Sequence, residues 1–284
     1  MNEQPVAVFD SGLGGLTVVR ALQRQLPGES IVYFGDTARV PYGTKSCRTV
    51  LQFAEQDCNF LLRFDPKLII AACNTASALA IDELAPQLPV PVLGVVRPGA
   101  AEAVRQAGGR PIAVLATPAT VASEAYPREI QAIAPDIAVT QQQCPSLVAM
   151  IEEGRGSDDP ILRMLLAEYL ESVRGLSPGV ILLGCTHYPL VADAIADLVP
   201  PARVVDSAQA TAIAAQRLLA ERDALSGISG RGTLRCYVSD NPQRFREIGG
   251  RFLGRPIRDV TWVTPEQFFQ ESLLGTPLGS DRCA

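Results

Sequence analysis

The sequence predicts an α/β fold of two similar domains, each a mostly parallel sheet flanked by helices. Short apolar, β-branched runs alternate with longer segments of helical periodicity along the chain. The apolar runs have the composition of strands buried on both faces, which is typical of parallel sheets covered by helices. At about 150 residues per domain, a chain of 284 residues provides for two domains.

Each element follows from one of two local patterns. Apolar, β-branched runs predict strands, and apolar residues spaced three and four positions apart predict helices. In chain order the predicted elements are strand 5–9, helix 14–25, strand 31–34, helix 44–64, strand 68–72, helix 77–84, strand 92–96, helix 99–107, strand 112–116, helix 119–133, strand 137–140, helix 160–174, strand 180–183, helix 191–198, strand 203–205, helix 208–221, strand 234–239, helix 243–253 and strand 257–263.

The composition narrows the classes of partner. Apolar residues make up 47% of the chain and charged residues 19%, which excludes a disordered chain. The net charge is −5 and there is no basic stripe, so no nucleic-acid partner is predicted. No stretch is apolar for long enough to span a membrane, and the start lacks a signal-peptide pattern. We therefore expect no membrane association and a cytoplasmic location.

No metal or cofactor is predicted either. The single histidine is His187, and the cysteines are spaced too widely for a zinc or iron–sulfur pattern. Pyridoxal phosphate needs a lysine for its Schiff base, and neither Lys45 nor Lys67 has the setting of a cofactor pocket. An odd number of cysteines without a secretion signal indicates reduced thiols. Away from the predicted strand ends, the cysteines are interpreted as structural or surface residues: Cys47, Cys58, Cys144, Cys236 and Cys283.

Polar and reactive side chains directly follow several predicted strands. Ligands of parallel α/β sheets bind beyond the carboxyl ends of the strands, so these positions are the first candidates for a site. They are Asp10 and Ser11, Asp36, Cys73 to Thr75, Thr117, Cys185 to His187, and Asp206.

Two of these strand ends resemble each other. Residues 68–75 and 180–187 each consist of a buried apolar run, a cysteine and a threonine within two positions. The repeat predicts two similar halves, the second beginning near Pro98. If the halves face each other, Cys73 and Cys185 approach one cleft from opposite sides. Polar residues able to cap a helix follow both cysteines, and a helix N-terminus favours the thiolate. The alternative is that both are small buried core residues.

The glycine-rich turn after the first predicted strand, residues 12–15, fits neither nucleotide-binding pattern. The dinucleotide fingerprint needs a glycine where Thr17 stands, and the P-loop needs a lysine that this turn lacks. We interpret it as a tight turn whose backbone N–H groups, at a helix N-terminus, bind a carboxylate. A turn without a ligand is the alternative.

Two thiols without a metal or cofactor suit proton exchange at a carbon atom. A thiolate removes a proton from one face of the substrate, and a thiol opposite returns one to the other face, which inverts the centre. The pKa of a free thiol is about 8.5, so modest tuning leaves one member ionised and the other protonated near neutral pH. His187, two positions after Cys185, is either a partner of this thiol or a structural histidine.

Four stretches around these residues resemble the glutamate racemases of the cofactor-independent aspartate/glutamate racemase superfamily. They are FDSGLGGLT (9–17), GDTARVPYG (35–43), ACNTA (72–76) and LGCTHYPL (183–190). The segments 205–208 and 252–254 are also similar, so the resemblance spans nearly the whole chain. In this chain Thr-His-Tyr-Pro follows the second cysteine, whereas in aspartate racemases this motif is usually absent from that position.

The resemblance implies roles for these residues. The family interconverts L- and D-glutamate and supplies D-glutamate for peptidoglycan. Cys73 would take the α-proton of the D-isomer with help from Asp10, and Cys185 that of the L-isomer with help from His187 and Glu152. Glu153 remains an alternative to Glu152, because the usual Pro-Leu-Val-Glu pattern is absent. The residues implied to hold the substrate are Asp10, Ser11, Tyr42, Gly43, Asn74, Thr75, Thr186 and His187.

The resemblance also implies a discontinuous first domain, 1–97 with 208–284, a second domain, 98–207, and the active site in the cleft between them. The partner would be a small-molecule substrate, and the chain would form a homodimer. Two alternatives stay open. One is an aspartate or other acidic amino-acid racemase. The other is a non-catalytic amino-acid-binding or regulatory protein on the same scaffold.

Overall fold

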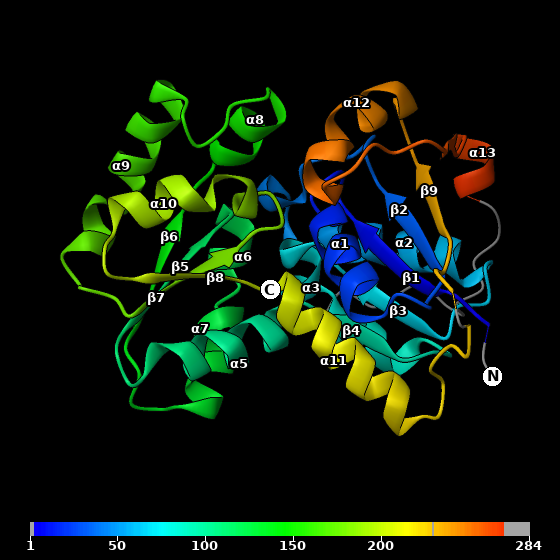
Figure 1. The fold of residues 1–284 in the computed structure, drawn as a ribbon, viewed down its shortest axis with the longest axis horizontal. Helices are drawn as coiled ribbons and strands as arrows, with labels where there is room; N and C mark the ends of the chain where they lie inside the picture. The colour runs from blue at the N-terminus through cyan, green and yellow to red at the C-terminus, as the bar shows by residue number, and fades with distance from the viewer. Residues whose placement is uncertain (1–2, 229, 270–284) are drawn as a thin grey trace.

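Two parallel sheets lie side by side in the computed structural model, which describes residues 3–228 and 230–269 (Figure 1). The strand orders are β10-β9-β2-β1-β3-β4 and β6-β5-β7-β8, and neighbouring strands run parallel. This confirms the predicted fold class. The strands are β1 Val6–Asp10, β2 Ile31–Gly35, β3 Leu68–Ala71, β4 Val92–Gly94, β5 Ile112–Ala116, β6 Val139–Gln143, β7 Val180–Gly184, β8 Arg203–Asp206, β9 Leu234–Val238 and β10 Val260–Trp262.

Helices cover both faces of each sheet, which explains the apolar strands. Val6 and Val8 of β1 pack with α1, α11 and α12, whereas Ala7 and Phe9 pack with α2 on the opposite face. In the second sheet, α9 and α10 cover one face and α5 and α7 the other. The α-helices are α1 Leu16–Gln25, α2 Cys47–Leu62, α3 Asn74–Leu79, α4 Ile81–Leu84, α5 Val96–Ala107, α6 Pro118–Ala122, α7 Ala125–Ile133, α8 Leu147–Glu152, α9 Pro160–Arg174, α10 Ala192–Leu198, α11 Ala208–Glu221, α12 Pro242–Leu253 and α13 Pro265–Phe268.

The second sheet repeats the order of four strands of the first. In β2-β1-β3-β4 and in β6-β5-β7-β8, the earliest strand lies inside, the next on one side and the two later ones on the other. Sheets of this kind bind ligands where the order reverses, between β1 and β3 or between β5 and β7. Cys73 follows β3 and Cys185 follows β7, so the two thiols occupy equivalent positions. The prediction of two similar halves is therefore confirmed at the level of strand order.

The chain passes from the first sheet to the second through α5 and returns through α11. The starts of these helices touch, because a Cβ built on Gly99 would lie 2.9 Å from the Cβ of Ser207. Strand β9 then pairs with β2, so the later part of the chain rejoins the first sheet. The division into domains 1–97 with 208–284, and 98–207, stays a prediction. Its last residues, 270–284, and Cys283 among them lie outside the described residues.

Local signals move several predicted boundaries. Helix 119–133 breaks at Glu124, where a φ of 54° separates α6 from α7. Helix 44–64 begins later, because the Ser46 side chain accepts a hydrogen bond from the backbone N–H of Thr49 and caps α2. Strand 137–140 shifts to β6, an edge strand with three glutamines, which the apolar-run criterion misses. Helix α8 was not predicted, because six residues are too few for a periodic pattern.

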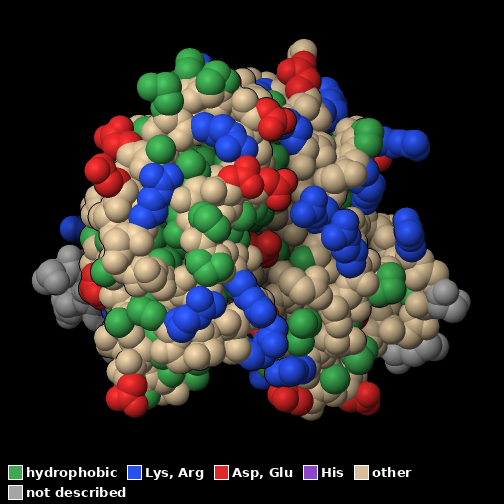
Figure 2. All heavy atoms as spheres, turned by 60° about the vertical axis from the view of Figure 1, so that its left-hand side comes forward, with side chains coloured by type: hydrophobic (Ala, Val, Ile, Leu, Met, Phe, Trp, Pro, Cys, Tyr) green, Lys and Arg blue, Asp and Glu red, His purple; other side chains and the backbone are tan. Residues whose placement is uncertain are grey.

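The surface is mixed in charge. On the face drawn in Figure 2, acidic and basic side chains are interspersed, and a hollow separates two bulges of the molecule. None of the helices formed by residues 3–228 and 230–269 is long and apolar enough to cross a membrane.

Candidate active site

The loops that follow β1 and β7 meet where the two sheets adjoin. Thr186 Oγ1 donates a hydrogen bond to Asp10 Oδ1 at 3.3 Å, and Thr17 Oγ1 donates to the Thr186 carbonyl at 3.4 Å. The loops approach so closely that a Cβ on Gly14 would lie 2.1 Å from Thr186 Oγ1. Glycine is needed at this position for space, and the turn brings together strand ends from the two sheets.

The glycine-rich turn binds a carboxylate, and that carboxylate is the chain's own Asp10. The backbone N–H of Gly12 donates to Asp10 Oδ2 at 3.0 Å, and the Asp10 side chain is fully buried. Burial raises the pKa of Asp10, and this rise is opposed by the charge of His187 and by backbone hydrogen bonds from Gly15 and Gly12. The turn thus satisfies a carboxyl group that would be costly to bury alone.

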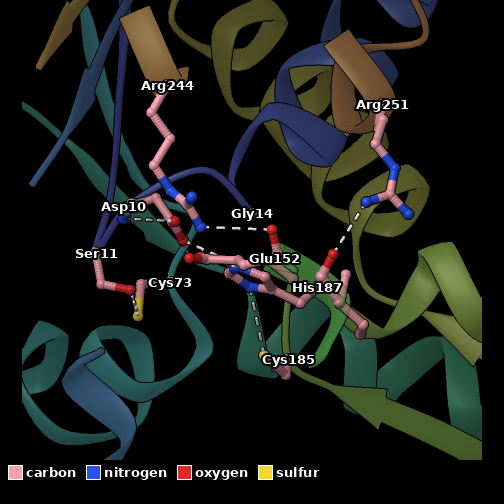
Figure 3. A network of polar contacts seen from close by, with 12 residues as sticks. Asp10, Ser11, Gly14, Cys73, Glu152, Cys185, His187, Arg244 and Arg251 are labelled. Atoms are coloured by element: carbon pink, nitrogen blue, oxygen red, sulfur yellow. Dashed lines mark hydrogen bonds and ion pairs between the residues drawn. The ribbon is translucent and has the colours of Figure 1, made fainter. Parts of the chain in front are cut away.

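Cys73 stands between β3 and α3, beside Asp10 and Ser11 (Figure 3). Its thiol donates to Ser11 Oγ at 3.7 Å, and the residue is 5% exposed. Burial raises the pKa of Cys73 to about 12; the negative charge of Asp10 adds to the rise, and the backbone N–H of Ala76 opposes it. This thiol therefore keeps its proton at neutral pH and is able to donate it.

Cys185 lies at the start of a chain of contacts with His187 and Glu152 (Figure 3). The Cys185 thiol is 3.9 Å from His187 Nδ1, and His187 Nε2 is 2.9 Å from Glu152 Oε1. Burial by itself would lower the pKa of His187, but the hydrogen bonds and negative charges of Cys185 and Glu152 raise it to about 10. The imidazole is therefore positively charged at neutral pH, and it lies beside the Cys185 thiol.

The two thiols thus have opposite electrostatic neighbours. A carboxyl group lies beside Cys73 and an imidazolium beside Cys185. The charge of Cys185 is also among the causes that raise the pKa of Cys73. One protonated thiol and one thiolate are the two species that a proton transfer between opposite faces of a substrate requires.

The contact with His187 favours Glu152 over Glu153 as the acid of this chain. Glu152 is on α8, and its side chain is 16% exposed. The Glu153 side chain is 63% exposed and pairs with Arg155 at 3.6 Å. Consecutive residues of a helix point in different directions, and sequence spacing alone does not show which of the two faces His187.

Asn74 and Thr75 lie in α3, where each contacts a residue of the second half. Asn74 Nδ2 donates to the Tyr126 hydroxyl at 2.7 Å, whereas its buried Oδ1 has no hydrogen-bond partner. The hydroxyls of Thr75, Thr117 and Thr120 lie within 2.9–3.1 Å of one another. Sequence reasoning assigned no role to Thr120 or Tyr126; the signal for this cluster was that Thr75 and Thr117 each follow a predicted strand.

Tyr42 is fully buried, and its neighbour Gly43 packs closely against Thr117. The Tyr42 hydroxyl donates to the carboxylates of Asp36 and Asp57. A Cβ on Gly43 would lie 2.5 Å from Thr117 Cβ, and Gly43, Thr117 and Glu152 line a cavity of about 130 Å³. A substrate contact from this segment would therefore come from its backbone, while the Tyr42 ring helps to hold the segment in place.

The other cysteines among the described residues take no part in these polar contacts, although the charge of Cys185 is among the causes that raise the pKa of Cys144. Cys58, Cys144 and Cys236 are buried free thiols, as structural residues are, whereas Cys47 is disulfide-bonded, so the prediction of reduced thiols is wrong for Cys47. Within the described ranges, no group of three or more His, Cys, Asp or Glu side chains is arranged to hold a metal ion.

Replacing Asp10 with asparagine should lower the pKa of the Cys73 thiol, because it removes a negative charge that raises this pKa while keeping the size of the side chain. The thiolate would then form at lower pH. Alkylation of Cys73 by iodoacetamide, followed by mass spectrometry across a pH series, measures the shift. Asp206→Asn is the control, because Asp206 ends strand β8 and instead accepts the backbone N–H of Ala208. A profile in Asp10→Asn that equals the control would refute this electrostatic account.

Comparisons with known proteins give a consistent result. The Asp/Glu/Hydantoin racemase family profile matches residues 14–215. A glutamate racemase of Syntrophus aciditrophicus is 46% identical over 260 residues, which cover 91% of this chain and 96% of that protein. The crystal structure of glutamate racemase from Francisella tularensis in complex with D-glutamate is similar with a TM-score of 0.86 and 37% identity, covering 93% and 98% of the two chains. The Thermus thermophilus glutamate racemase, in complex with β-chloro-D-alanine, has a TM-score of 0.84 and 42% identity and covers 94% and 100%.

Proposed function

Since this chain belongs to the Asp/Glu/Hydantoin racemase family and is an amino-acid racemase, we propose that it interconverts L- and D-glutamate with Cys73 and Cys185 as its two bases. The substrate is supported by the relatives, which are glutamate racemases at 40–46% identity. The observation that carries the mechanism is the pair of buried thiols at equivalent strand ends, one beside a carboxyl group and the other beside an imidazolium.

In the direction from L to D, the Cys185 thiolate takes the α-proton. The C–H bond breaks, an S–H bond forms, and the electron pair stays on the α-carbon and its carboxylate. Cys73 then gives its proton to the opposite face and becomes the thiolate. In the direction from D to L the two thiols exchange roles. His187, held by Glu152, stabilises the Cys185 thiolate, and Asp10 sets the protonation of Cys73.

The polar groups around the thiols supply the contacts that a small amino acid needs. The unpaired Oδ1 of Asn74 is an acceptor for the substrate ammonium group, and the hydroxyls of Ser11, Thr75 and Thr186 are donors for its carboxylates. Asp10, His187 and the backbone of residues 42–43 complete the proposed set. The substrate would lie between the two proposed domains, which the contacts of α3 with Tyr126 and Thr117 join.

The wider role follows from the family resemblance. D-Glutamate from this reaction would serve peptidoglycan synthesis in the cytoplasm. The homodimer stays a prediction, and light scattering of the purified chain would test it.

The test of the proposed function is proton exchange in heavy water. The purified, reduced protein is incubated with L-glutamate and a chelator, and no cofactor is added. We expect loss of optical rotation together with deuterium at the α-carbon of the product, because a two-base reaction takes the incoming proton from solvent through the second thiol. Nuclear magnetic resonance and polarimetry measure the two changes in one sample.

The same assay separates the alternatives. Faster turnover of L-aspartate than of L-glutamate would keep the chemistry and change the substrate. Binding of glutamate without exchange, by protein shown to be folded and reduced, would favour an amino-acid-binding protein and contradict the proposal.

A further inference from the structure

We propose that Arg251 of α12 is a positioning residue that, together with Arg244 and Phe252, holds Glu152 in contact with His187 from the other half of the molecule. The inference rests on the proposed function, in which Cys185, His187 and Glu152 form one half of the catalytic machinery. Glu152 and His187 follow strands of the second sheet, whereas α12 packs on the first sheet, where Phe245 and Phe252 lie in the same core as Val8 and Leu16.

Two arginine side chains of α12 bind the backbone where α8 ends (Figure 3). Arg251 Nη1 donates to the Ile151 carbonyl at 3.0 Å, and its Nη2 donates to the Arg155 carbonyl at 3.4 Å. Arg244 Nη2 donates to the carbonyl of Glu152 itself at 3.4 Å. One end of α8 is therefore held by two cations that belong to a different part of the fold.

The end of α8 is a site where cations stabilise a helix. The last carbonyl groups of any helix lack intrahelical partners and carry the negative end of the helix dipole, and arginine side chains bind such groups. A helix of six residues is too short to be stable alone, so its position depends on tertiary contacts. Leu147 and Ile151 anchor the buried side of α8, and the arginines fix the end that carries Glu152.

Helix α12 also contacts His187, the residue that Glu152 binds. The ring of Phe252 packs edge-on against the His187 imidazole, with 5.1 Å between the ring centres and an angle of 78°. Helix α12 therefore binds the backbone of Glu152 with an arginine side chain and contacts the imidazole of His187 with the ring of Phe252. Both members of the His187–Glu152 pair are thus held by a helix that packs on the first sheet.

The sharpest test uses the fact that His187 is the single histidine of the chain. Its imidazole gives one set of nuclear magnetic resonance signals in tag-free protein, which can be titrated without substrate. If Arg251→Ala releases Glu152, the pKa of His187 should fall by about one unit or more, since a charged partner is withdrawn. Arg246→Ala is the matched control: Arg246 is on the same helix and exposed, and it makes no ion pair or side-chain hydrogen bond with any described residue.

The kinetic readout separates positioning from general damage. The enantiomers have equal energy in water, so a variant must lose kcat/KM equally in both directions; we expect about a ten- to hundredfold loss for Arg251→Ala. A weakened Cys185 step becomes rate-limiting, so the α-deuterium isotope effect on kcat/KM should rise for L-glutamate and fall for D-glutamate. Arg251→Lys, which keeps one cation, should recover part of the rate.

Each outcome of these measurements decides the proposal. A His187 titration in Arg251→Ala that matches Arg246→Ala would overturn it, even if the rate falls. Equal changes in the two isotope effects would also overturn it, because they indicate a general loss of structure rather than a weaker Cys185 step. Absence of glutamate racemisation in the unmodified protein would overturn the proposed function instead, and the titration would still report whether Arg251 holds Glu152.

Discussion

Replacing Cys73 with alanine will abolish racemisation of both enantiomers of glutamate, with a loss of at least about 10²–10⁴-fold, the usual contribution of a general acid or base. The variant lacks the group that gives a proton to one face and takes it from that face in the reverse direction. Cys185→Ala should have the same effect on racemisation, because each direction needs both thiols. Polarimetry with each enantiomer measures the loss.

Hydrogen exchange without inversion distinguishes the two variants. In Cys73→Ala, Cys185 can still remove the α-proton of L-glutamate and return a solvent deuteron to the same face. L-Glutamate should therefore take up deuterium without inversion, and D-glutamate should not. Cys185→Ala should show the reverse. Cys58→Ala removes a buried thiol of α2 that makes none of the polar contacts of the site, so this variant serves as control and should racemise normally. Racemisation by Cys73→Ala would refute the two-base assignment, and the opposite exchange pattern would exchange the roles of the thiols.

Adding one methyl group at Gly14 should nearly inactivate the protein. The Cβ of Gly14→Ala would lie 2.1 Å from Thr186 Oγ1 and 2.6 Å from His187 Nδ1, so both side chains must move. A displacement of this size at a catalytic group costs about 10²-fold in rate, and overpacking costs about 1–3 kcal/mol in the free energy of unfolding. The rate and the denaturant midpoint are measured on one preparation.

The matched control for this variant is Gly156→Ala. A Cβ on Gly156 would meet no atom within 4 Å, so the same chemical change should leave rate and stability nearly unaltered. If Gly14→Ala racemised glutamate as fast as Gly156→Ala, the close contact between the turn and the loop after β7 would not matter for catalysis.

The sequence predicted those parts of the site that the strands deliver. Asp10, Cys73 and Cys185 each follow an apolar run that is a strand in the structure, and parallel order brings such ends together. The contact of Cys185 with His187 was within reach of sequence reasoning, because the two residues are neighbours in the chain. Their partners Ser11 and Thr186 came from the same loops.

The groups that helices bring to the site could not be predicted in this way. Tyr126 and Thr120 meet Asn74 and Thr75 only because α6 and α7 pack near α3, which no local pattern reveals. The motif that contains Tyr42 did not show that its hydroxyl binds Asp36 and Asp57. No sequence pattern separates the arginines of α12 that contact α8 from those that do not, because the difference depends on where α8 lies in the fold.

The contact between the starts of α5 and α11 has a consequence for turnover. Both passages of the chain between the sheets are side by side at Gly99 and Ser207, while the two thiols are only 5% and 7% exposed. An amino acid would reach thiols so enclosed only after part of the structure moves aside, and a turn of the two halves about this junction would open the space between them. Such an opening would displace solvent, so turnover would depend on the viscosity of the solvent as well as on proton transfer.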